Sequence, residues 1–511
     1  MSLPDPDRFV LMPSPTSEPQ PQRAPPRLLR RRLSLALFIT VAAFLTLLLL
    51  HRIRNEVCGR STFLAAAGFC PVLSNVHWDL FYHLGGNGPW IPKINGVDYS
   101  DALLPDDCSV DQAHMLSRHA ERYPTKNAGA RHFDLLERLQ SPAVNVTGPL
   151  SFLTTWTYFT DPSDPAFDNL TTSGPYAGTI QSFNTGKILR QRYDHLVPRT
   201  GRTKLWSCSS ERDVETAKMF ADGFFGTQWT SDGSAELEVI PEDEDRGANT
   251  LTPGDTCSQY LGDEKYGHDY GYSKLAEWQN VFTEPIAKRL AKYATGMRFG
   301  PLDIYSMMEM CGFETLARGV SPWCNVFTHK EWLEFEYARD LLHFYRAGPG
   351  NSYAGAMGLL WLNATQNLMS NGSSKDVYFS FVHDGDIVPV LATLEIFNEE
   401  LVPQKLPANH MKMDRRWRTS DVVPMGGRLI FERITCGKTF KSAATEHFVR
   451  LFINDGLVEV PRQRSVTKIK HALRLADFQD FLASQREHFG DFRTVCSLPD
   501  DAADGIRFLH Q

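Results

Sequence analysis

The stretch around which we interpret this chain is AHMLSRHAERYPT, residues 113–125. It begins as a short apolar run of the kind that forms a buried strand, and the run stops at Arg118. Arg118 and Arg122 then place two permanent positive charges around His119. Because nearby like charge disfavours a protonated imidazole, we expect His119 to stay neutral in acid, as a nucleophile must. These residues alone are equally compatible with a solvated helix start that carries charge pairs.

Two further apolar runs also stop where polar side chains begin. One is KLWSC, residues 204–208, which precedes Arg212 at the start of a helix-like segment; the other is VYFSFV, residues 377–382, which precedes His383 and Asp384. Sites in open α/β sheets form at the carboxyl ends of strands, so we expect the three strand ends to meet. A helix N-terminus attracts anions, which favours Arg212 as part of an anion site. A His-Asp pair at a strand end is weak evidence for a functional site by itself, because such a pair often only caps a turn.

If the three ends meet, the pocket has the chemistry for phosphoryl transfer. Guanidinium groups match phosphate oxygens and keep their charge, so they can neutralise the transition state. His119 would attack phosphorus and form a phosphohistidine, and Asp384 would have to be protonated in order to act as the general acid. The sequence contains no cluster of His, Cys, Asp and Glu at metal-ligand spacing, so no metal or other cofactor is expected. The phosphate-binding residues would be Arg118, Arg122, Arg212 and His383.

The rest of the chain indicates a sheet domain with a helical insertion. It has 511 residues and a net charge of −7, and no basic surface argues for a nucleic-acid partner. From about 270 to 370 the pattern is mostly helical, and we expect the helical subdomain to extend over roughly 215–370. Strands return as RLIFERITC, residues 428–436, and as the hairpin-like HFVRLFINDGLVEVP, residues 447–461. We therefore expect an α/β fold with a smaller, mostly helical domain inserted.

The N-terminal region predicts a membrane anchor. Residues 1–32 are rich in Pro and Arg and predict a disordered tail, and residues 33–50 are uncharged over a length at the lower limit for a spanning helix. More arginines precede the run than follow it, which places the N-terminus in the cytosol. We expect a single-pass type II protein with a stalk over 51–75 and a lumenal or extracellular domain over 76–511. A cleavable signal peptide is the alternative, although the run is long for one.

The cysteines and sequons agree with a compartment outside the cytosol. All 9 cysteines follow the apolar run, and an odd number in an oxidising compartment suggests four bridges and one spare thiol. Asn-X-Ser/Thr sequons, which accept N-linked glycans, also lie after the run. They are headed by Asn145, Asn169, Asn363 and Asn371.

Several collinear stretches resemble the histidine acid phosphatases, specifically the fungal branch with yeast-type secreted acid phosphatases and fungal phytases. They include YHLGGNGPW, MLSRHAERYPT, SSERDVETAKMFADGF, CGFETLARGVSPWCNVF, FSFVHDGDI and VPMGGRLIFERITC, and the resemblance runs from about residue 58 to 498. The glycines of HLGGNGP lack the Lys-Ser/Thr ending of a phosphate-binding loop, and they belong to a turn of the family.

The resemblance implies a mixed sheet flanked by helices, with a smaller helical domain beside the pocket, and a phosphate monoester as substrate. It places the nucleophile at His119, the proton donor at Asp384, and the phosphate clamp at Arg118, Arg122, Arg212 and His383. It pairs Cys58 with Cys70, Cys108 with Cys436, Cys257 with Cys496 and Cys311 with Cys324, and leaves Cys208 as a buried free thiol.

The chain departs from the family in two ways. The family has Arg-His-Gly where this chain has Ala120, and alanine would be costly if that position needs a positive φ. The apolar anchor is the second departure, since many relatives are simply secreted. Glu121 is expected to be a surface charge rather than a base.

The leading interpretation is a membrane-anchored acid phosphatase of broad monoester range. Within the same chemistry the alternative is a phytase acting on inositol hexakisphosphate, with basic residues such as Lys126 and Arg131 in the outer pocket. A catalytically inactive protein that captures phosphorylated ligands is the alternative from another class. The intact set of charged residues disfavours it.

Overall fold

The predicted strand ends are brought together by one mixed sheet. The computed structural model describes residues 78–511 except 94–102, 372–374, 398–404, 438–444 and 461–466. Within these ranges the strands of the main sheet are β1 Cys108–Arg118, β3 Thr203–Cys208, β4 Ala235–Ile240, β6 Asp376–Val382, β7 Arg428–Cys436, β8 Glu446–Ile453, β9 Gly456–Val458 and β10 Leu473–Arg474. Their order is β10-β8-β7-β1-β6-β3-β4, with β9 paired to β8.

The direction of the strands decides where the site forms. β1, β6, β3 and β4 run parallel, whereas β7 runs antiparallel to β1 and β8 antiparallel to β7. The carboxyl ends of β1, β6 and β3 therefore lie at the same edge of the sheet, as predicted. β1 is central and buried on both faces, with Met115 and Leu116 at most 1% exposed, which explains its nearly continuous apolar sequence.

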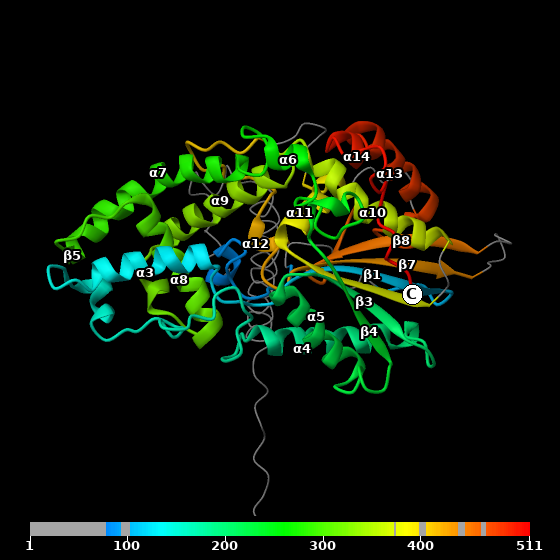
Figure 1. The fold of residues 1–511 in the computed structure, drawn as a ribbon, viewed down its shortest axis with the longest axis horizontal. Helices are drawn as coiled ribbons and strands as arrows, with labels where there is room; N and C mark the ends of the chain where they lie inside the picture. Colours follow the sequence, from blue (N-terminus) through cyan, green and yellow to red (C-terminus); the bar gives the residue numbers. More distant parts are fainter. Residues whose placement is uncertain (1–77, 94–102, 372–374, 398–404, 438–444, 461–466) are drawn as a thin grey trace, which may run out of the picture. The chain divides into compact units, whose positions relative to one another are not determined.

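Helices cover both faces of the sheet (Figure 1). The main ones are α4 Gly178–Tyr193, α5 Glu211–Phe225, α10 Ala354–Asn371, α11 Asp384–Thr393 and α13 Leu475–Phe489. α5 packs against β3, β4 and β6, and α4 lies beside α5 on the same face, where Tyr193 donates to Glu432 of β7. α10, α11 and α13 lie over the other face. The buried stripe of α5, which includes Ala217, Phe220 and Phe224, matches its helical periodicity, and the helix ends at Gly226 with φ 94°.

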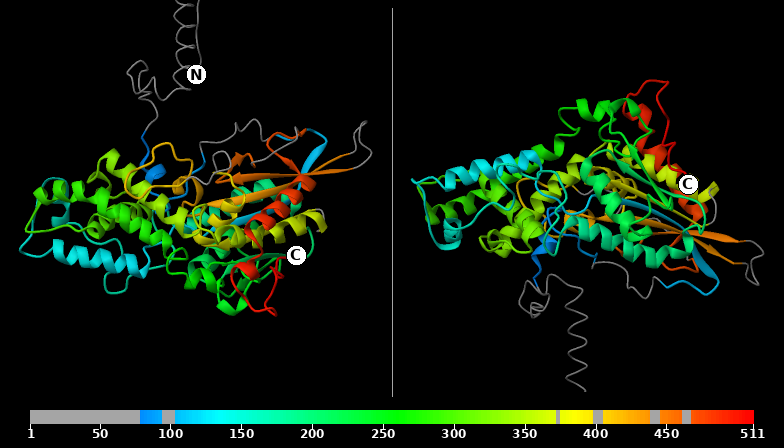
Figure 2. Two further views of the ribbon diagram at one scale, coloured as in Figure 1. Left: turned by 90° about the horizontal axis from the view of Figure 1, so that it is seen from above. Right: turned by 60° about the horizontal axis from the view of Figure 1, so that its bottom comes forward.

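A group of helices lies beside the sheet, on the left of Figure 1, and both views of Figure 2 show it there. It consists of α3 Lys126–Leu139, α7 Tyr270–Leu290, α8 Pro301–Arg318 and α9 His329–Arg346. α7 packs against α8 and α9, and α3 packs against α8. This group does not match the predicted helical insertion over 215–370. β4 lies within that range but belongs to the main sheet, and α3 belongs to the group but precedes the range, since it comes before β3 in the chain. Helical periodicity shows which side of a helix is buried, but not what it packs against.

Short elements join the longer ones. β2 and β5 form an antiparallel pair. The bounds are β2 Asn145–Val146, β5 Ala294–Thr295, α6 Ser258–Gly262, α12 Thr419–Val422 and α14 Phe492–Val495, with 3₁₀ turns at Leu80–His83, Gly148–Thr154, Asp194–Leu196, Glu244–Arg246, Ala291–Tyr293 and Pro322–Asn325.

Disulfides connect distant parts of the described chain. Three of the pairs that the family resemblance implies are present: Cys108–Cys436, Cys257–Cys496 and Cys311–Cys324. The first joins directly opposed residues of β1 and β7. Cys208 is a buried free cysteine, as predicted. The remaining predicted pair, Cys58 with Cys70, lies outside the described residues.

The predicted tail, the anchor at 33–50 and the predicted stalk also lie outside the described residues. In the described part of the chain, no helix has both the length and the apolar character needed to cross a bilayer. Among the sequon asparagines, Asn145, Asn169 and Asn371 are exposed, and Asn363 is half-buried within α10.

Candidate active site

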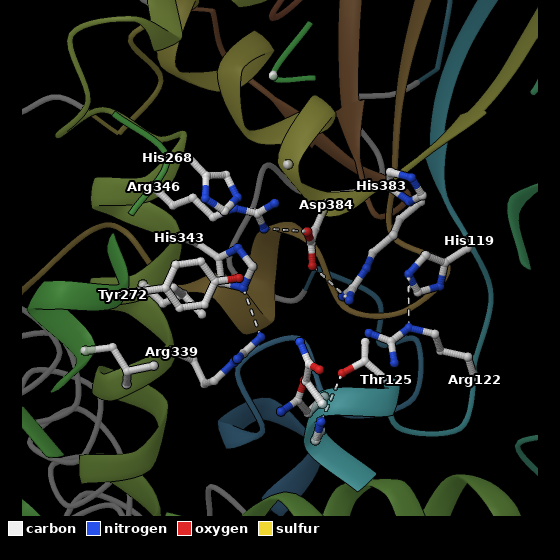
Figure 3. A pocket seen from close by; sticks show the side chains of 18 of the residues that line it. His119, Arg122, Thr125, His268, Tyr272, Arg339, His343, Arg346, His383 and Asp384 are labelled. Atoms are coloured by element: carbon white, nitrogen blue, oxygen red, sulfur yellow. Dashed lines mark hydrogen bonds and ion pairs between the residues drawn. The ribbon is translucent and has the colours of Figure 1, made fainter. Parts of the chain in front are cut away.

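A cavity of about 770 Å³ lies where the sheet edge meets the helical group (Figure 3). Its sheet side is formed by residues that follow β1, begin α5 and begin α11, and the opposite side is formed largely by α7, α8 and α9. All of the catalytic and phosphate-binding candidates from the sequence line this cavity: Arg118, His119, Arg122, Arg212, His383 and Asp384.

The glycine turn at residues 85–86 positions two of the cavity's arginines. The carbonyl oxygen of Gly86 accepts from Nη1 of Arg118 at 2.8 Å, and that of Gly85 accepts from Nε of Arg339 at 2.9 Å. Both glycines have positive φ, and a Cβ on Gly85 would lie 2.2 Å from Cβ of Arg339. The turn thus presents carbonyl oxygens to cations, which agrees with the prediction that it is not a phosphate-binding loop.

Two hydrogen bonds determine the tautomer of His119. Its Nδ1 lies 2.9 Å from the carbonyl oxygen of Ala120, which can only accept, so Nδ1 carries the proton. Nε of Arg122 donates to Nε2 of His119 at 3.4 Å, so Nε2 carries the lone pair. Both contacts select the same tautomer of the neutral imidazole. Nε2 is therefore the nitrogen available for attack.

The pKa of His119 lies well below its usual value. Burial is the largest cause, followed by the charges of Arg118, Arg122 and Arg212. The sequence predicted the direction of this pKa shift from the charges alone. The larger contribution comes from burial, because His119 is only 2% exposed. His119 therefore stays neutral to a lower pH than a free imidazole does.

Ala120 fits its position without backbone strain. It is not among the described non-glycine residues with positive φ, so a glycine conformation is not required there. Its backbone N–H donates to Oγ1 of Thr216 at 2.9 Å, and that hydroxyl donates in turn to the carbonyl of Arg212 at 2.7 Å. These bonds tie the loop after β1 to α5.

The expectation that Glu121 is a surface charge is wrong. Glu121 is 0% exposed, and its Oε1 accepts from the backbone N–H of Trp90 at 2.8 Å. Burial raises the pKa of this carboxyl to about 7. Its position in a string of charged residues suggested exposure, but the loop after β1 runs through the interior.

Asp384 is an ionised carboxylate in this site. Its Oδ2 lies 2.9 Å from Nη2 of Arg118, and its Oδ1 lies 3.6 Å from Nη1 of Arg346. Burial acts to raise its pKa, but the charges of Arg118, His343 and Arg346 outweigh burial and hold the pKa well below the usual value. The requirement for a protonated Asp384 is therefore not met before substrate binds. Any proton-donor role needs a negative charge to enter first.

His383 lies between two carboxylates. Its Nδ1 is 3.0 Å from Oδ2 of Asp213, and its Nε2 is 3.3 Å from Oε2 of Glu242. Burial acts to lower the pKa of His383, yet Asp213 and Cys208 raise it well above the usual value. Glu242, hydrogen-bonded to His383, has its pKa lowered to about 2 despite burial. His383 therefore adds a positive charge, and Arg212 approaches its Nδ1 at 3.2 Å.

Sequence reasoning missed the opposite wall of the cavity. Arg339, His343 and Arg346 lie on α9 with spacings of four and three residues, which places them on one helix face directed at the cavity (Figure 3). The spacing in YARDLLHFYR could have revealed this face. Of the two outer-pocket candidates, Arg131 lines the cavity and pairs with Glu309 at 2.7 Å, whereas Lys126 is exposed and is not part of the lining.

The structure also brings together a set of metal-type ligands that the sequence did not show. Cys208, Glu242 and His383 have ligand atoms that all lie within 4.8 Å of one another. They come from the end of β3, the loop after β4 and the end of β6. No spacing motif could show this cluster, because it forms only when the parallel strands align.

Comparisons with known proteins agree with the geometry of this site. A family model of the histidine phosphatase superfamily, branch 2, matches residues 109–454. An acid phosphatase of Komagataella pastoris is 33% identical over 85% of this chain and 90% of its own length, and a phytase of Candida albicans is 31% identical over 81% and 86%. The crystal structure of the phytase from D. castellii superposes with a TM-score of 0.76 and 26% identity, over 88% of this chain and 93% of the phytase. The chain belongs to branch 2 of the histidine phosphatase superfamily and is a phosphoric monoester hydrolase of its acid phosphatase and phytase group.

Proposed function

We propose that this chain hydrolyses phosphate monoesters through a phosphohistidine formed on Nε2 of His119. The observation that carries the proposal is a neutral imidazole enclosed by guanidinium groups, with its lone pair on the nitrogen nearest Arg122. A buried imidazole at this place has no structural partner for Nε2 other than Arg122 among the described residues. Such a group is suited to attack a phosphorus atom whose oxygens are held by the surrounding cations.

In the first step, the phosphoryl group binds among Arg118, Arg122, Arg212 and His383. These cations hold its non-bridging oxygens and neutralise the charge that develops on them. Nε2 of His119 forms a bond to phosphorus while the bond to the ester oxygen breaks. The new N–P bond leaves the imidazole positively charged, and its Nδ1–H remains bonded to the carbonyl of Ala120.

Asp384 supplies a proton to the departing ester oxygen. Before substrate binds, Arg118 and Arg346 hold it as a carboxylate. A bound phosphoryl group adds negative charge beside Asp384 and takes part of the interaction with Arg118, and both effects raise the pKa of the carboxyl. Substrate binding and acidic pH therefore act together to protonate Asp384.

The second step releases phosphate and restores the site. Asp384, now a carboxylate, takes a proton from a water molecule, whose oxygen attacks phosphorus as the N–P bond breaks. Inorganic phosphate leaves, and His119 returns to its neutral form. The cycle needs no electron transfer and no further reactant besides water.

The lining of the outer cavity supports broad monoester hydrolysis over preference for phytate. Arg131 is neutralised by Glu309, which has a pKa lowered to about 2 mainly by its contacts with His132 and Arg131 against the effect of burial. Glu242 and Asp255 add further carboxylates to the lining. A ligand with many phosphate groups would meet these carboxylates as well as the guanidinium groups of Arg339 and Arg346. The alternative, a phytase, is supported by the similar phytases and by the size of the cavity.

We also propose that residues 33–50 anchor the enzyme as a single-pass type II protein with residues 76–511 in the secretory lumen or outside the cell. The apolar run and the arginines before it support the anchor. The three disulfides support an oxidising compartment, and the exposed sequons support N-glycosylation. Washing membranes with alkaline carbonate tests the anchor: the chain should stay in the membrane, and a mature N-terminus beyond residue 60 would contradict it.

Hydrolysis assays with the full chain in detergent test the activity. At acidic pH the chain should release phosphate from nitrophenyl phosphate and from simple alkyl phosphates, with a higher kcat/KM for these than for inositol hexakisphosphate. A higher kcat/KM for inositol hexakisphosphate would assign the chain to the phytases. Binding without hydrolysis would instead identify an inactive phospho-ligand-binding protein.

A further inference from the structure

Three potential metal ligands lie together at the phosphate-binding end of the cavity, and two of them, Glu242 and His383, line it. Sγ of Cys208 lies 3.6 Å from Nε2 of His383, and Oε2 of Glu242 lies 3.3 Å from the same nitrogen. The phosphoryl-transfer mechanism uses His383 but assigns no role to Cys208 or Glu242. A thiol, an imidazole nitrogen and a carboxylate oxygen thus converge on one point.

The two measured separations match those expected around a tetrahedral zinc ion. With Zn–S of about 2.3 Å and Zn–N and Zn–O of about 2.1 Å, tetrahedral angles place sulfur about 3.6 Å from nitrogen and nitrogen about 3.4 Å from oxygen. The ligand atoms of the third pair, Cys208 and Glu242, lie within 4.8 Å of each other. Three protein ligands leave the fourth position open to water or an anion.

The surroundings of His383 provide independent support. Asp213 is 0% exposed, and its Oδ2 lies 3.0 Å from Nδ1 of His383 and 3.6 Å from Nε of Arg212. Histidines that bind metals through one nitrogen commonly hold a carboxylate with the other, which orients the ring and strengthens the ligand. The backbone N–H of His383 donates to Asp386 at 3.0 Å, so a further carboxylate lies close by.

We propose that Cys208, His383 and Glu242 bind a thiophilic divalent cation of the Zn²⁺ and Cd²⁺ type, and that the bound ion inhibits the enzyme. A thiolate selects such cations over Mg²⁺ and Ca²⁺. Inhibition rests on the proposed function, in which His383 binds the phosphoryl group. An ion bound to Nε2 of His383 makes that ring unavailable to the phosphoryl group and therefore competes with substrate. The inhibition should therefore raise KM for the monoester more than it lowers kcat.

The test uses Cd²⁺ as the probe and separates binding from activity. Adding Cd²⁺ to the full chain in detergent should produce the ultraviolet charge-transfer band of a cadmium thiolate, saturating at one ion per chain. Cys208→Ser and Cys208→Ala should both lose the band, and the inhibition of each variant is measured against its own activity without Cd²⁺. In the same variants the Cd²⁺ concentration for half-inhibition should rise at least tenfold. His268→Gln, which removes another histidine of the same cavity, is the matched control and should behave as the wild type.

The outcomes distinguish this site from the catalytic mechanism. His119→Ala should bind Cd²⁺ as the wild type does, so the binding result stands whether or not His119 is the nucleophile. An unchanged charge-transfer band in Cys208→Ser would overturn the site. Equal inhibition of the wild type and Cys208→Ser, or inhibition that lowers kcat alone, would overturn the proposed inhibition through His383.

Discussion

Nε of Arg122 donates to Nε2 of His119 across 3.4 Å, while Nη1 of the same guanidinium is held by the carbonyl of Tyr123 at 2.7 Å. The arginine is thus fixed by its own loop and presents a charge to the lone pair of the imidazole. This contact keeps a proton off Nε2 and leaves that nitrogen directed into the cavity. Substrate must then replace Arg122 as the partner of Nε2.

Removing the charge of Arg122 should raise the pKa of His119. In Arg122→Gln the pKa should rise but stay below the usual value, because burial, Arg118 and Arg212 still act. A higher pKa means that protonation inactivates His119 at a less acidic pH, so the acid limb of the kcat profile should move toward neutrality. Arg122→Lys, which keeps the charge, should move it less. NMR of the labelled imidazoles measures this directly, and a wild-type His119 that titrates near 6.5 would contradict the account.

Asp384→Asn should affect substrates according to their leaving groups. Alkyl phosphates need a proton on the departing oxygen, so their kcat should fall by about 10²–10⁴-fold. Nitrophenyl phosphate, whose leaving group is stable as an anion, should lose much less. The ratio of the two kcat values in wild type and variant is the measurement. Equal losses on both substrates would remove Asp384 from the role of general acid.

Glu121 should stabilise the fold in acid and not at neutral pH. Its pKa is raised from 4.5 to about 7, so its contribution is complete below pH 4.5 and is lost as the pH rises through 7. The shift corresponds to about 3 kcal/mol of unfolding free energy. Denaturant unfolding of the wild type and Glu121→Gln across this range should give a difference that shrinks, or reverses in favour of the variant, with rising pH. A difference independent of pH would mean that Glu121 titrates normally.

The cysteines should show one protected thiol in the described part of the chain. Cys208 is buried and its pKa is raised well above the usual thiol value, mainly by burial, so an alkylating probe should not label it in the native protein. After unfolding without reduction, the label should appear on Cys208. Label on Cys311 or Cys324 would contradict the disulfides. Replacing Cys108 and Cys436 by serine should cost about 2–5 kcal/mol of stability, because that bridge closes the longest loop of the three.

The sequence predicts the part of the site that lies along strands. Apolar runs that stop at charged residues located the ends of β1, β3 and β6, and the topology rule brought Arg118, Arg212 and His383 together. It did not predict Glu242, which enters from a loop after β4 and is close to His383 only in three dimensions. Nor did it show that Glu121 is buried, because a short run of charged residues has the same pattern in an interior loop and on a surface.

The charge state of Asp384 could not be predicted either, because it too depends on contacts between distant parts of the chain. Its place at the start of α11 could be predicted, but its charge state depends on Arg118 and on Arg346, which lies on a distant helix. The mechanism inferred from the sequence required Asp384 to be protonated in order to act as the general acid. The ion pairs instead make protonation conditional on substrate.

The phosphohistidine is tested most directly by trapping it. Radiolabelled monoester should be mixed with the full chain and quenched within one turnover in alkali, since the N–P bond hydrolyses in acid. The wild type should carry up to one phosphoryl group per chain, mapped to the peptide of His119. His119→Ala should carry none and should not turn over. Label on another residue, or turnover that survives in His119→Ala, would contradict the central claim.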